Sequence, residues 1–203
     1  MLYFDAVKPA TLEVLRLVSR FPEFKKYFLV GGTALTLHIG HRISEDIDLF
    51  TLEDFDSENL YIVLKQKLTI TDYKYSHNTL RFWVNDIKVE LLTYSYPLLD
   101  QILVSDAIRL LSIKDIIPMK LSAIESRGSK KDFFDFYFLH NFFPLKDMLQ
   151  LYSQKFNHKN TQNILKALSY FDDAENEPNP IMLQPLSWDK VKATIVSIIK
   201  NYK

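Results

Sequence analysis

Two aspartates separated by a single residue are the strongest candidates for chemistry in this sequence. Asp46, Ile47 and Asp48 begin an alternating segment that continues through Leu49 and Phe50, and such alternation predicts a half-buried strand. On a strand, residues two apart lie about 6.7 Å from each other and point to the same face. Two carboxylates so placed offer the hard oxygen ligands that Mg²⁺ takes. A solvated strand edge is the competing interpretation, but two acids on one face of an otherwise apolar strand would repel each other.

A glycine pair precedes these aspartates. The apolar run from Tyr27 to Val30 leads into Gly31, Gly32 and Thr33, which predicts a strand, a tight turn and then a helix. Thr33 is placed to cap this helix and Gly40 to end it. A helix N-terminus favours anions, and glycine lets a phosphate approach the backbone. A Gly-Gly pair is also common as a plain structural turn, so this motif alone is weak.

A third acid, Glu90, lies within the strand-like segment from Ile87 to Leu92. If its strand neighbours the strand of Asp46, three carboxylates converge on one cleft that could hold a triphosphate with bridging metal ions. The competing interpretation is an exposed strand residue paired with a lysine.

The segments from Val30 to Leu35 and from His41 to Phe50 together resemble the AbiEii/AbiGii-type nucleotidyltransferases. These are toxins of bacterial toxin–antitoxin and phage-defence systems, related to the MenT toxins. A second stretch is similar to the same family and consists of Asp115–Leu121, Arg127-Gly128 and Lys131–Tyr137. The resemblance covers about residues 20 to 140, with weaker similarity from Tyr170 to Trp188.

This resemblance implies a DNA polymerase β-like core and assigns roles to individual residues. Gly31, Gly32 and Thr33 match the phosphate turn. Asp46 and Asp48 match the metal ligands, and Glu90 the third carboxylate, where Asp is commoner.

The downstream motif of the family is matched by Lys120, Arg127 and Asp132. Lys120 and Arg127 are expected to be cations that neutralise the triphosphate, facing the carboxylates from the second half of the chain. Asp132 or Asp135 could orient them, and Arg42 is a further candidate for a phosphate contact. Structural interpretations stay open: Asp115 as an N-cap before Pro118 in a first helical turn, Ser129 and Asp132 as a capping box, and the two cations as a solvated helix face.

The elements expected around these residues change character near residue 100. Before it, strands are predicted at 27–30, 43–51, 68–73, 80–84 and 87–94, with helices at 11–21, 33–39 and 56–66 and a two-residue turn at Asn85-Asp86. After Ser105 we expect helices at about 115–127, 130–140, 145–154, 160–171 and 187–202, no strand, and a loop over 172–185. The predicted fold is α+β: a mixed-sheet nucleotidyltransferase domain with flanking helices at 1–100, followed by an all-helical domain at 101–203.

Composition narrows the functional classes. The chain has 203 residues, 25 basic and 25 acidic side chains, and no cysteine. A neutral balance argues against a dedicated high-affinity nucleic-acid binder, and the lack of cysteine excludes disulfides and thiolate chemistry. Since no apolar run reaches the roughly 18 residues that span a bilayer, and no signal-peptide pattern begins the chain, we expect a cytoplasmic protein without membrane contact.

The leading hypothesis is an Mg²⁺-dependent enzyme that transfers a nucleoside monophosphate from an NTP to an acceptor and releases pyrophosphate. The resemblance implies a toxin whose acceptor is RNA, such as the 3′ end of tRNA, and whose partner is a cognate antitoxin. Two alternatives are a small-molecule nucleotidyltransferase of the aminoglycoside-modifying kind and a catalytically weak nucleotide-binding module that serves an interaction.

Overall fold

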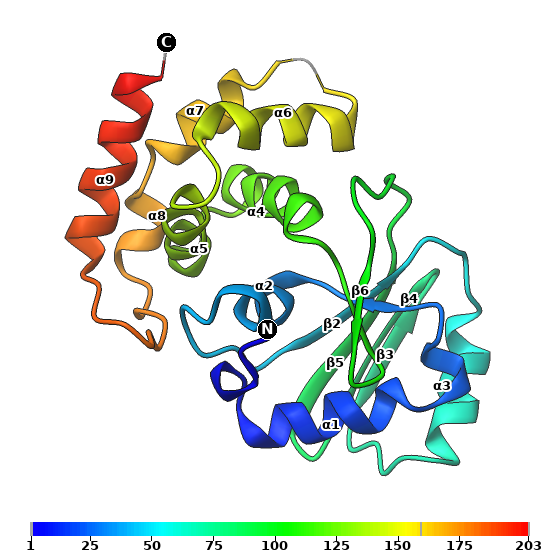
Figure 1. Ribbon diagram of the computed structural model, residues 1–203. Helices are drawn as coiled ribbons and strands as arrows, with labels where there is room; N and C mark the ends of the chain where they lie inside the picture. The colour runs from blue at the N-terminus through cyan, green and yellow to red at the C-terminus, as the bar shows by residue number, and fades with distance from the viewer. Residues whose placement is uncertain (1, 159, 203) are drawn as a thin grey trace. The chain divides into compact units, whose positions relative to one another are not determined.

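The structure is a computed structural model that describes residues 2–158 and 160–202 and forms two compact units (Figure 1). The sheet unit consists of Met1–Gly40, Ser44–Tyr96 and Gln101–Ser112, and the helical unit of His41–Ile43, Pro97–Asp100 and Ile113–Lys203. The chain therefore passes between the units more than once, and the helical unit proper begins at Ile113 rather than near residue 101.

The sheet unit is built on a seven-stranded mixed sheet in the order β3-β4-β5-β2-β1-β7-β6. The central pair β2 and β5 is parallel, whereas β4 and β5 form an antiparallel hairpin. The hairpin turn is Asn85-Asp86, at φ 51° and 62°, as predicted from the tolerance of these residues for positive φ. The strands are β1 (Phe28–Leu29), β2 (Ile47–Thr51), β3 (Tyr73–Ser76), β4 (Thr79–Val84), β5 (Ile87–Thr93), β6 (Leu103–Ser105) and β7 (Ile108–Leu110).

Alternation along the central strands separates a core face from a partly open face. In β2 the buried residues are Ile47, Leu49 and Thr51, and in β5 they include Val89 and Leu91. The residues between them are only half-buried. Because the side-chain period of a strand is two, Asp48 and Glu90 belong to the partly open face.

Three α-helices accompany the sheet (Figure 1): α1 (Pro9–Ser19) packs against β5 and β7, α2 (Gly31–Ile39) against β2, and α3 (Ser57–Lys65) against β3 and β4. Asp56 caps α3, because its carboxylate accepts a hydrogen bond from the Asn59 N–H at 3.0 Å. Gly40 ends α2 at φ 60°, the left-handed conformation that glycine adopts without strain.

The helical unit is centred on α4 (Ile113–Ser126), which packs against α5 (Lys130–His140), α6 (Leu145–Phe156) and α7 (Gln162–Leu168). A short helix α8 (Asp172–Glu175) precedes the final helix α9 (Trp188–Asn201), which packs on α5 and α7. Phe133 and Phe134 of α5 are fully buried, and their rings lie 5.7 and 5.8 Å from the ring of Trp188. No helix among the described residues is long and apolar enough to cross a membrane.

The predicted α+β fold is confirmed, with four corrections. The expectation of no strand after Ser105 is wrong, because residues 103–110 form a hairpin whose second strand pairs in parallel with β1. The strand predicted at 68–73 lies instead at Tyr73–Ser76, since Leu68 closes the turn after α3 and is buried. Pro118 lies inside α4 rather than in its first turn, and residues 172–175 of the predicted loop are helical.

Candidate functional site

The acids proposed from the sequence lie on one face of the sheet unit. Asp48 and Glu90 are direct partners in the parallel pairing of β2 and β5, so their side chains project to the same side. Asp46 precedes Asp48 by two residues and lies directly before β2, which begins at Ile47. The ammonium of Lys88 lies 3.5 Å from Asp46 Oδ1 and 4.0 Å from Glu90 Oε2, so both acids border the same space.

Gly31 places the start of α2 directly against Asp48. Its φ is +68°, and a Cβ built there would lie 2.6 Å from Asp48 Oδ2. Only glycine satisfies both the left-handed backbone and this close approach. A carboxylate at a helix N-terminus is stabilised by the helix dipole, and the first N–H groups of a helix have no partner within it. The predicted phosphate turn and the predicted metal ligand are therefore adjacent.

Thr33 has a different role from the predicted helix cap. The cap position is Val30, and Thr33 lies within α2 with its side chain buried. Its hydroxyl donates to the backbone oxygen of Asp46 and lies 2.9 Å from Ser44 Oγ. Thr33 thus fixes the backbone that carries Asp46, which couples the glycine turn to the first aspartate.

Two cations that the sequence did not single out by residue lie beside these acids. Arg81 on β4 donates from Nη2 to Glu90 Oε1 at 2.5 Å, and Lys88 lies between Asp46 and Glu90. The register of the β4–β5 hairpin places Arg81 opposite Glu90. The site on the sheet unit therefore combines acids with cations of its own.

A hard divalent cation fits the donor chemistry of Asp46 and Asp48. Among residues 2–158 and 160–202, however, no three His, Asp or Glu side chains are grouped closely enough to hold a metal. Glu90 is on the correct face, but its carboxylate is engaged by Arg81. The residues present therefore fit a metal site built on the aspartate pair, with Glu90 held alongside by its arginine.

The downstream residues form a buried ionic cluster in the helical unit, centred on Asp135. Arg42 binds Asp135 with two N–H groups, at 2.7 and 3.0 Å, and His41 Nε2 lies 2.7 Å from the same carboxylate. The Lys120 ammonium lies 2.6 Å from Asp135 and 3.1 Å from Asp132. Because the Arg42 side chain is 6% exposed and bound to Asp135, its place is structural, in contrast to the phosphate contact considered from the sequence.

Arg127 is the accessible member of this cluster. It donates to Asp132 from Nε at 2.8 Å and from Nη2 at 3.1 Å, yet its side chain remains 56% exposed. Asp132 is completely buried and lies within 3.1 Å of both Lys120 and Arg127. Asp132 therefore contacts both cations and holds the position from which an acid could orient them.

Charge balance determines the ionisation of the cluster. Burial by itself would raise the pKa of Asp135, but Arg42, Lys120 and the hydrogen bond from His41 hold it well below the ordinary 3.8. Burial lowers the pKa of His41, and the attraction of Asp135 offsets this only in part. His41 is therefore neutral at pH 7, and its Nε2–H donates to the ionised Asp135.

Two structural interpretations offered by the sequence are corrected in the helical unit. Asp115 does not cap α4; it is buried within the helix, where it accepts from the Leu99 and Asp100 N–H groups and from Lys155 at 2.7 Å. Ser129 makes no capping-box bond. Instead, Glu177 accepts from the Ser129 hydroxyl and from the Lys130 N–H at the start of α5.

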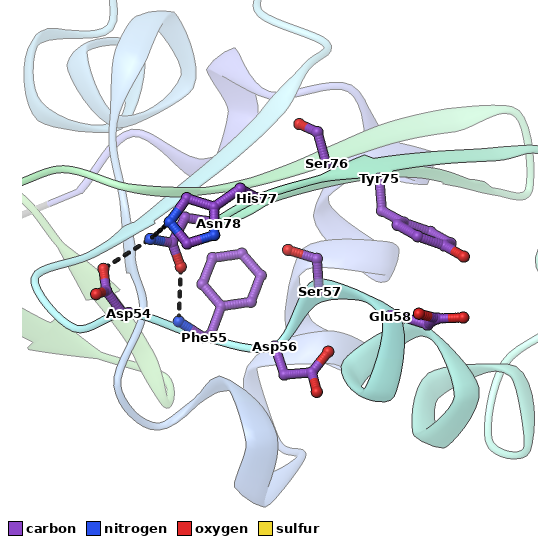
Figure 2. Close-up of a pocket in the computed structure, with 9 residues that line it drawn as sticks. All are labelled: Asp54, Phe55, Asp56, Ser57, Glu58, Tyr75, Ser76, His77 and Asn78. Carbon is purple, nitrogen blue, oxygen red and sulfur yellow. Dashed lines mark hydrogen bonds between the residues drawn. The ribbon is translucent and has the colours of Figure 1, made fainter.

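A separate open hollow of about 580 Å³ lies between the 54–58 segment and β3 (Figure 2). Its acids already have structural partners: Asp56 caps α3, and Asp54 accepts from Asn78 Nδ2 at 2.7 Å. Asn78 also accepts from the Phe55 N–H at 2.9 Å. This hollow is therefore lined by a loop whose hydrogen bonds hold Asp54 and Asp56 in place.

Comparison with known proteins identifies the fold and the family of the chain. The structure is similar to MenT4, a nucleotidyltransferase toxin of Mycobacterium tuberculosis, with a TM-score of 0.61 and 13% identity over 96% of this chain and 82% of that one. It is also similar to JHP933 of Helicobacter pylori, with a TM-score of 0.57 and 18% identity over 98% and 92% of the chains. At these identities the likeness establishes the fold. In sequence, the uncharacterized protein aq_aa25 of Aquifex aeolicus is 33% identical over 202 residues, 97% of each chain.

The model of the family described as "Nucleotidyl transferase AbiEii toxin, Type IV TA system" matches residues 13–92 and 87–199. The chain belongs to this family of nucleotidyltransferase toxins. Its enzymatic class is therefore nucleotidyl transfer, and the carboxylate face and the ionic cluster lie in the parts of the chain that the family model matches.

Proposed function

We propose that this chain transfers a nucleoside monophosphate from an NTP to a hydroxyl of RNA, such as the 3′ end of tRNA, at the face that carries Asp46 and Asp48. The observation that supports this most directly is the contact between Gly31 and Asp48, because it joins an anion-binding helix start to a carboxylate pair. A polyphosphate and a hard cation are the two ligands that such a junction suits.

In this proposal, the residues of the sheet unit have distinct roles in binding phosphate and metal. The backbone N–H groups at Gly31 and Gly32 bind phosphate oxygens, and Asp46 and Asp48 would hold Mg²⁺. Bound there, this ion would lower the pKa of the acceptor hydroxyl and offset the charge of the departing pyrophosphate. Arg81 keeps Glu90 in register beside the pair.

In the helical unit, Arg127 is our candidate for binding a phosphate group, because its guanidinium is positioned by Asp132 and remains largely exposed. An arginine can bind a phosphate through two parallel N–H groups. Lys120, which is buried between Asp132 and Asp135, is assigned to the support of this arginine. The description of the family as toxins of a toxin–antitoxin system implies a cognate antitoxin as a partner.

The test is incubation of the purified protein with each α-labelled NTP, Mg²⁺ and total tRNA. We expect label in the RNA, release of pyrophosphate, and loss of both in EDTA. Label on an added aminoglycoside but not on RNA would instead support a small-molecule transferase. Metal-dependent NTP binding without pyrophosphate release would support a binding module.

A further inference from the structure

A second hollow of the sheet unit, of about 480 Å³, is lined by cations and by no acid. It lies between the end of α1, the turn that follows it, and the β6–β7 hairpin. The carboxylates Asp46, Asp48 and Glu90 take no part in it. Its walls are formed by Ser19, Arg20, Phe24, Lys25, Tyr27, Leu49, Val104, Ala107 and Arg109.

The three cations of this hollow are not neutralised within the protein. Among residues 2–158 and 160–202, the side chains of Arg20, Lys25 and Arg109 have no ion-pair or hydrogen-bond partner. Arg20 and Lys25 are exposed at the rim, whereas Arg109 is half-buried. Arg20 at the end of α1 is explained by the helix dipole, but nothing in the sheet unit accounts for a partly buried, unpaired arginine.

Two buried polar atoms of the lining lack partners as well. Arg109 Nε and Tyr27 Oη are both shielded from solvent, and neither has a hydrogen-bond partner among the described residues. Tyr27 is 2% exposed, and burial, with a smaller contribution from Glu53, raises its pKa, so its hydroxyl stays protonated. Buried polar groups are rarely left unpaired, because each costs about 1–3 kcal/mol. Such atoms point to a missing ligand.

The remaining lining is apolar and partly aromatic. Phe24 and Tyr27 lie with their ring centroids 5.9 Å apart, and Val104 is the cross-strand partner of Arg109. The volume falls within the range of about 300–1,000 Å³ that is usual for small-molecule sites. The hollow therefore offers positive charge for a multiply charged anion and an apolar wall for a flat organic body.

We propose that this hollow binds a nucleoside phosphate, with its phosphate held by Arg109, Arg20 and Lys25 and its nucleoside against Phe24 and Val104. The ligand can be a free nucleotide or one nucleotide unit of an RNA strand, since both present the same group. Binding here requires no metal, and it is independent of the transfer reaction proposed for the carboxylates.

The experiment is calorimetric titration of the full chain in EDTA, which removes the metal that the carboxylate face would use. The probes are AMP, inorganic phosphate, adenosine and a 12-nucleotide single-stranded RNA. We expect AMP to bind more tightly than phosphate or adenosine alone. Arg109→Gln should weaken AMP binding about tenfold or more, the loss of one charged hydrogen bond.

Further variants keep the proposal testable. The double variant Arg20→Gln/Lys25→Gln, which changes only exposed side chains, should weaken AMP binding in the same way, even if Arg109→Gln fails to fold. Lys65→Gln, at an exposed lysine of α3, is the matched control and should leave AMP binding in EDTA unchanged. Asp48→Asn, which should impair transfer, should likewise leave this metal-free AMP binding unchanged. In a competition titration, RNA that occupies the hollow at a lower concentration than AMP does identifies an RNA strand as the ligand. RNA that does not displace bound AMP identifies the free nucleotide as the ligand. The proposal is overturned if the wild type binds no AMP, if the cation variants bind it normally, or if Asp48→Asn abolishes binding.

Discussion

Asp48 is the residue on which the proposed chemistry depends most directly. Replacement of Asp48 by Ala should reduce transfer by on the order of a hundredfold or more, because a metal ligand is lost. It should change the free energy of unfolding little, because relief of the repulsion between neighbouring carboxylates offsets the lost interaction of Asp48 with the α2 dipole. Steady-state transfer rates and thermal unfolding measure the two effects. Asp5→Asn, a change at an exposed acid of the same unit, is the control. Wild-type activity in Asp48→Ala would show that Asp48 is not a metal ligand.

Gly31 can be distinguished from other left-handed glycines by what lies next to it. Gly31→Ala and Gly128→Ala both place a Cβ at positive φ, at +68° and +55°, which costs about 1–2 kcal/mol. Only at Gly31 would the new Cβ collide with Asp48, at 2.6 Å, whereas the nearest atom at Gly128 is 3.6 Å away. We therefore expect similar losses of stability but a selective loss of transfer in Gly31→Ala. Equal activity in the two variants would separate the glycine turn from the site.

Lys88 lies in the space that a metal bound by Asp46 would share. Its ammonium is 3.5 Å from Asp46 and 4.0 Å from Glu90, so it competes electrostatically with a divalent cation for these oxygens. Lys88→Gln should raise the affinity for Mn²⁺, used as a spectroscopic substitute for Mg²⁺, by several-fold at low ionic strength. Titration followed by electron paramagnetic resonance measures this affinity. Unchanged or weaker Mn²⁺ binding would mean that Lys88 does not oppose the metal.

At the scale of elements, the Asp135 cluster joins α4 and α5 to the segment 41–43. Asp135→Asn leaves Arg42 and Lys120 buried without their principal carboxylate, so it should destabilise the fold by about 3–5 kcal/mol. Arg127→Gln removes a mostly exposed member and should cost less than about 1 kcal/mol. Urea unfolding compares the two variants. A small effect of Asp135→Asn would mean that the cluster is not a stabilising element.

The same cluster should make stability depend on pH in a defined direction. The pKa of His41 is below its ordinary 6.5 in the folded protein, so the unfolded chain binds the proton first and stability is lost as the pH falls below 6.5. The pKa of Asp135 is also lowered, so its contribution is present above the unfolded pKa of about 3.9 and is lost at more acidic pH. His41→Gln should reduce the dependence of the unfolding free energy on pH between pH 5 and about 6.5. The pKa of His140 is also lowered, so this residue accounts for part of the pH dependence that remains. An unchanged slope in urea unfolding would contradict the assignment.

The elements show how far the sequence could predict the site. Alternation in β2 placed Asp46 and Asp48 on one face, and the Asn85-Asp86 turn was recognised from its residue types. That two-residue turn already fixes the hairpin register, in which Arg81 is opposite Glu90, so Arg81 could have been found. The pairing of β2 with β5 could not have been predicted, because it joins segments about forty residues apart and local patterns do not specify long-range partners.

Other features were out of reach for a different physical reason. The β6–β7 hairpin was missed because its strands have three residues each, too few for a periodic signal. The link from Arg42 to Asp135 spans 93 positions and depends on which cations can satisfy a fully buried acid. By contrast, the helix predicted at 130–140 lies at Lys130–His140, since it is long and rich in apolar residues.

At the scale of the whole molecule, the division into units does not follow the order of the chain. Residues 41–43 and 97–100 belong to the helical unit although sheet-unit segments flank them. Each of these two segments makes specific contacts within the helical unit. Arg42 binds Asp135, and the Leu99 and Asp100 N–H groups donate to Asp115. The helical unit is therefore completed by two short segments that come from the first half of the sequence.

This topology predicts how fragments of the chain will behave. The fragment 113–203 lacks Arg42 and His41, so Asp135 keeps Lys120 as its nearby cation, and Asp115 loses two backbone donors while it remains paired with Lys155. Leaving buried charges without their partners costs several kcal/mol. This amount is comparable with the total stability of a small domain, roughly 5–15 kcal/mol. We expect 113–203 to unfold without a cooperative transition. The fragment 97–203 restores the donors to Asp115 and should be more stable, although still below the helical unit of the full chain. Circular dichroism during urea titration and amide hydrogen exchange at α4 and α5 compare the three proteins. Cooperative unfolding of 113–203 at the midpoint of the full chain would show that the two returning segments contribute nothing to the fold of the helical unit.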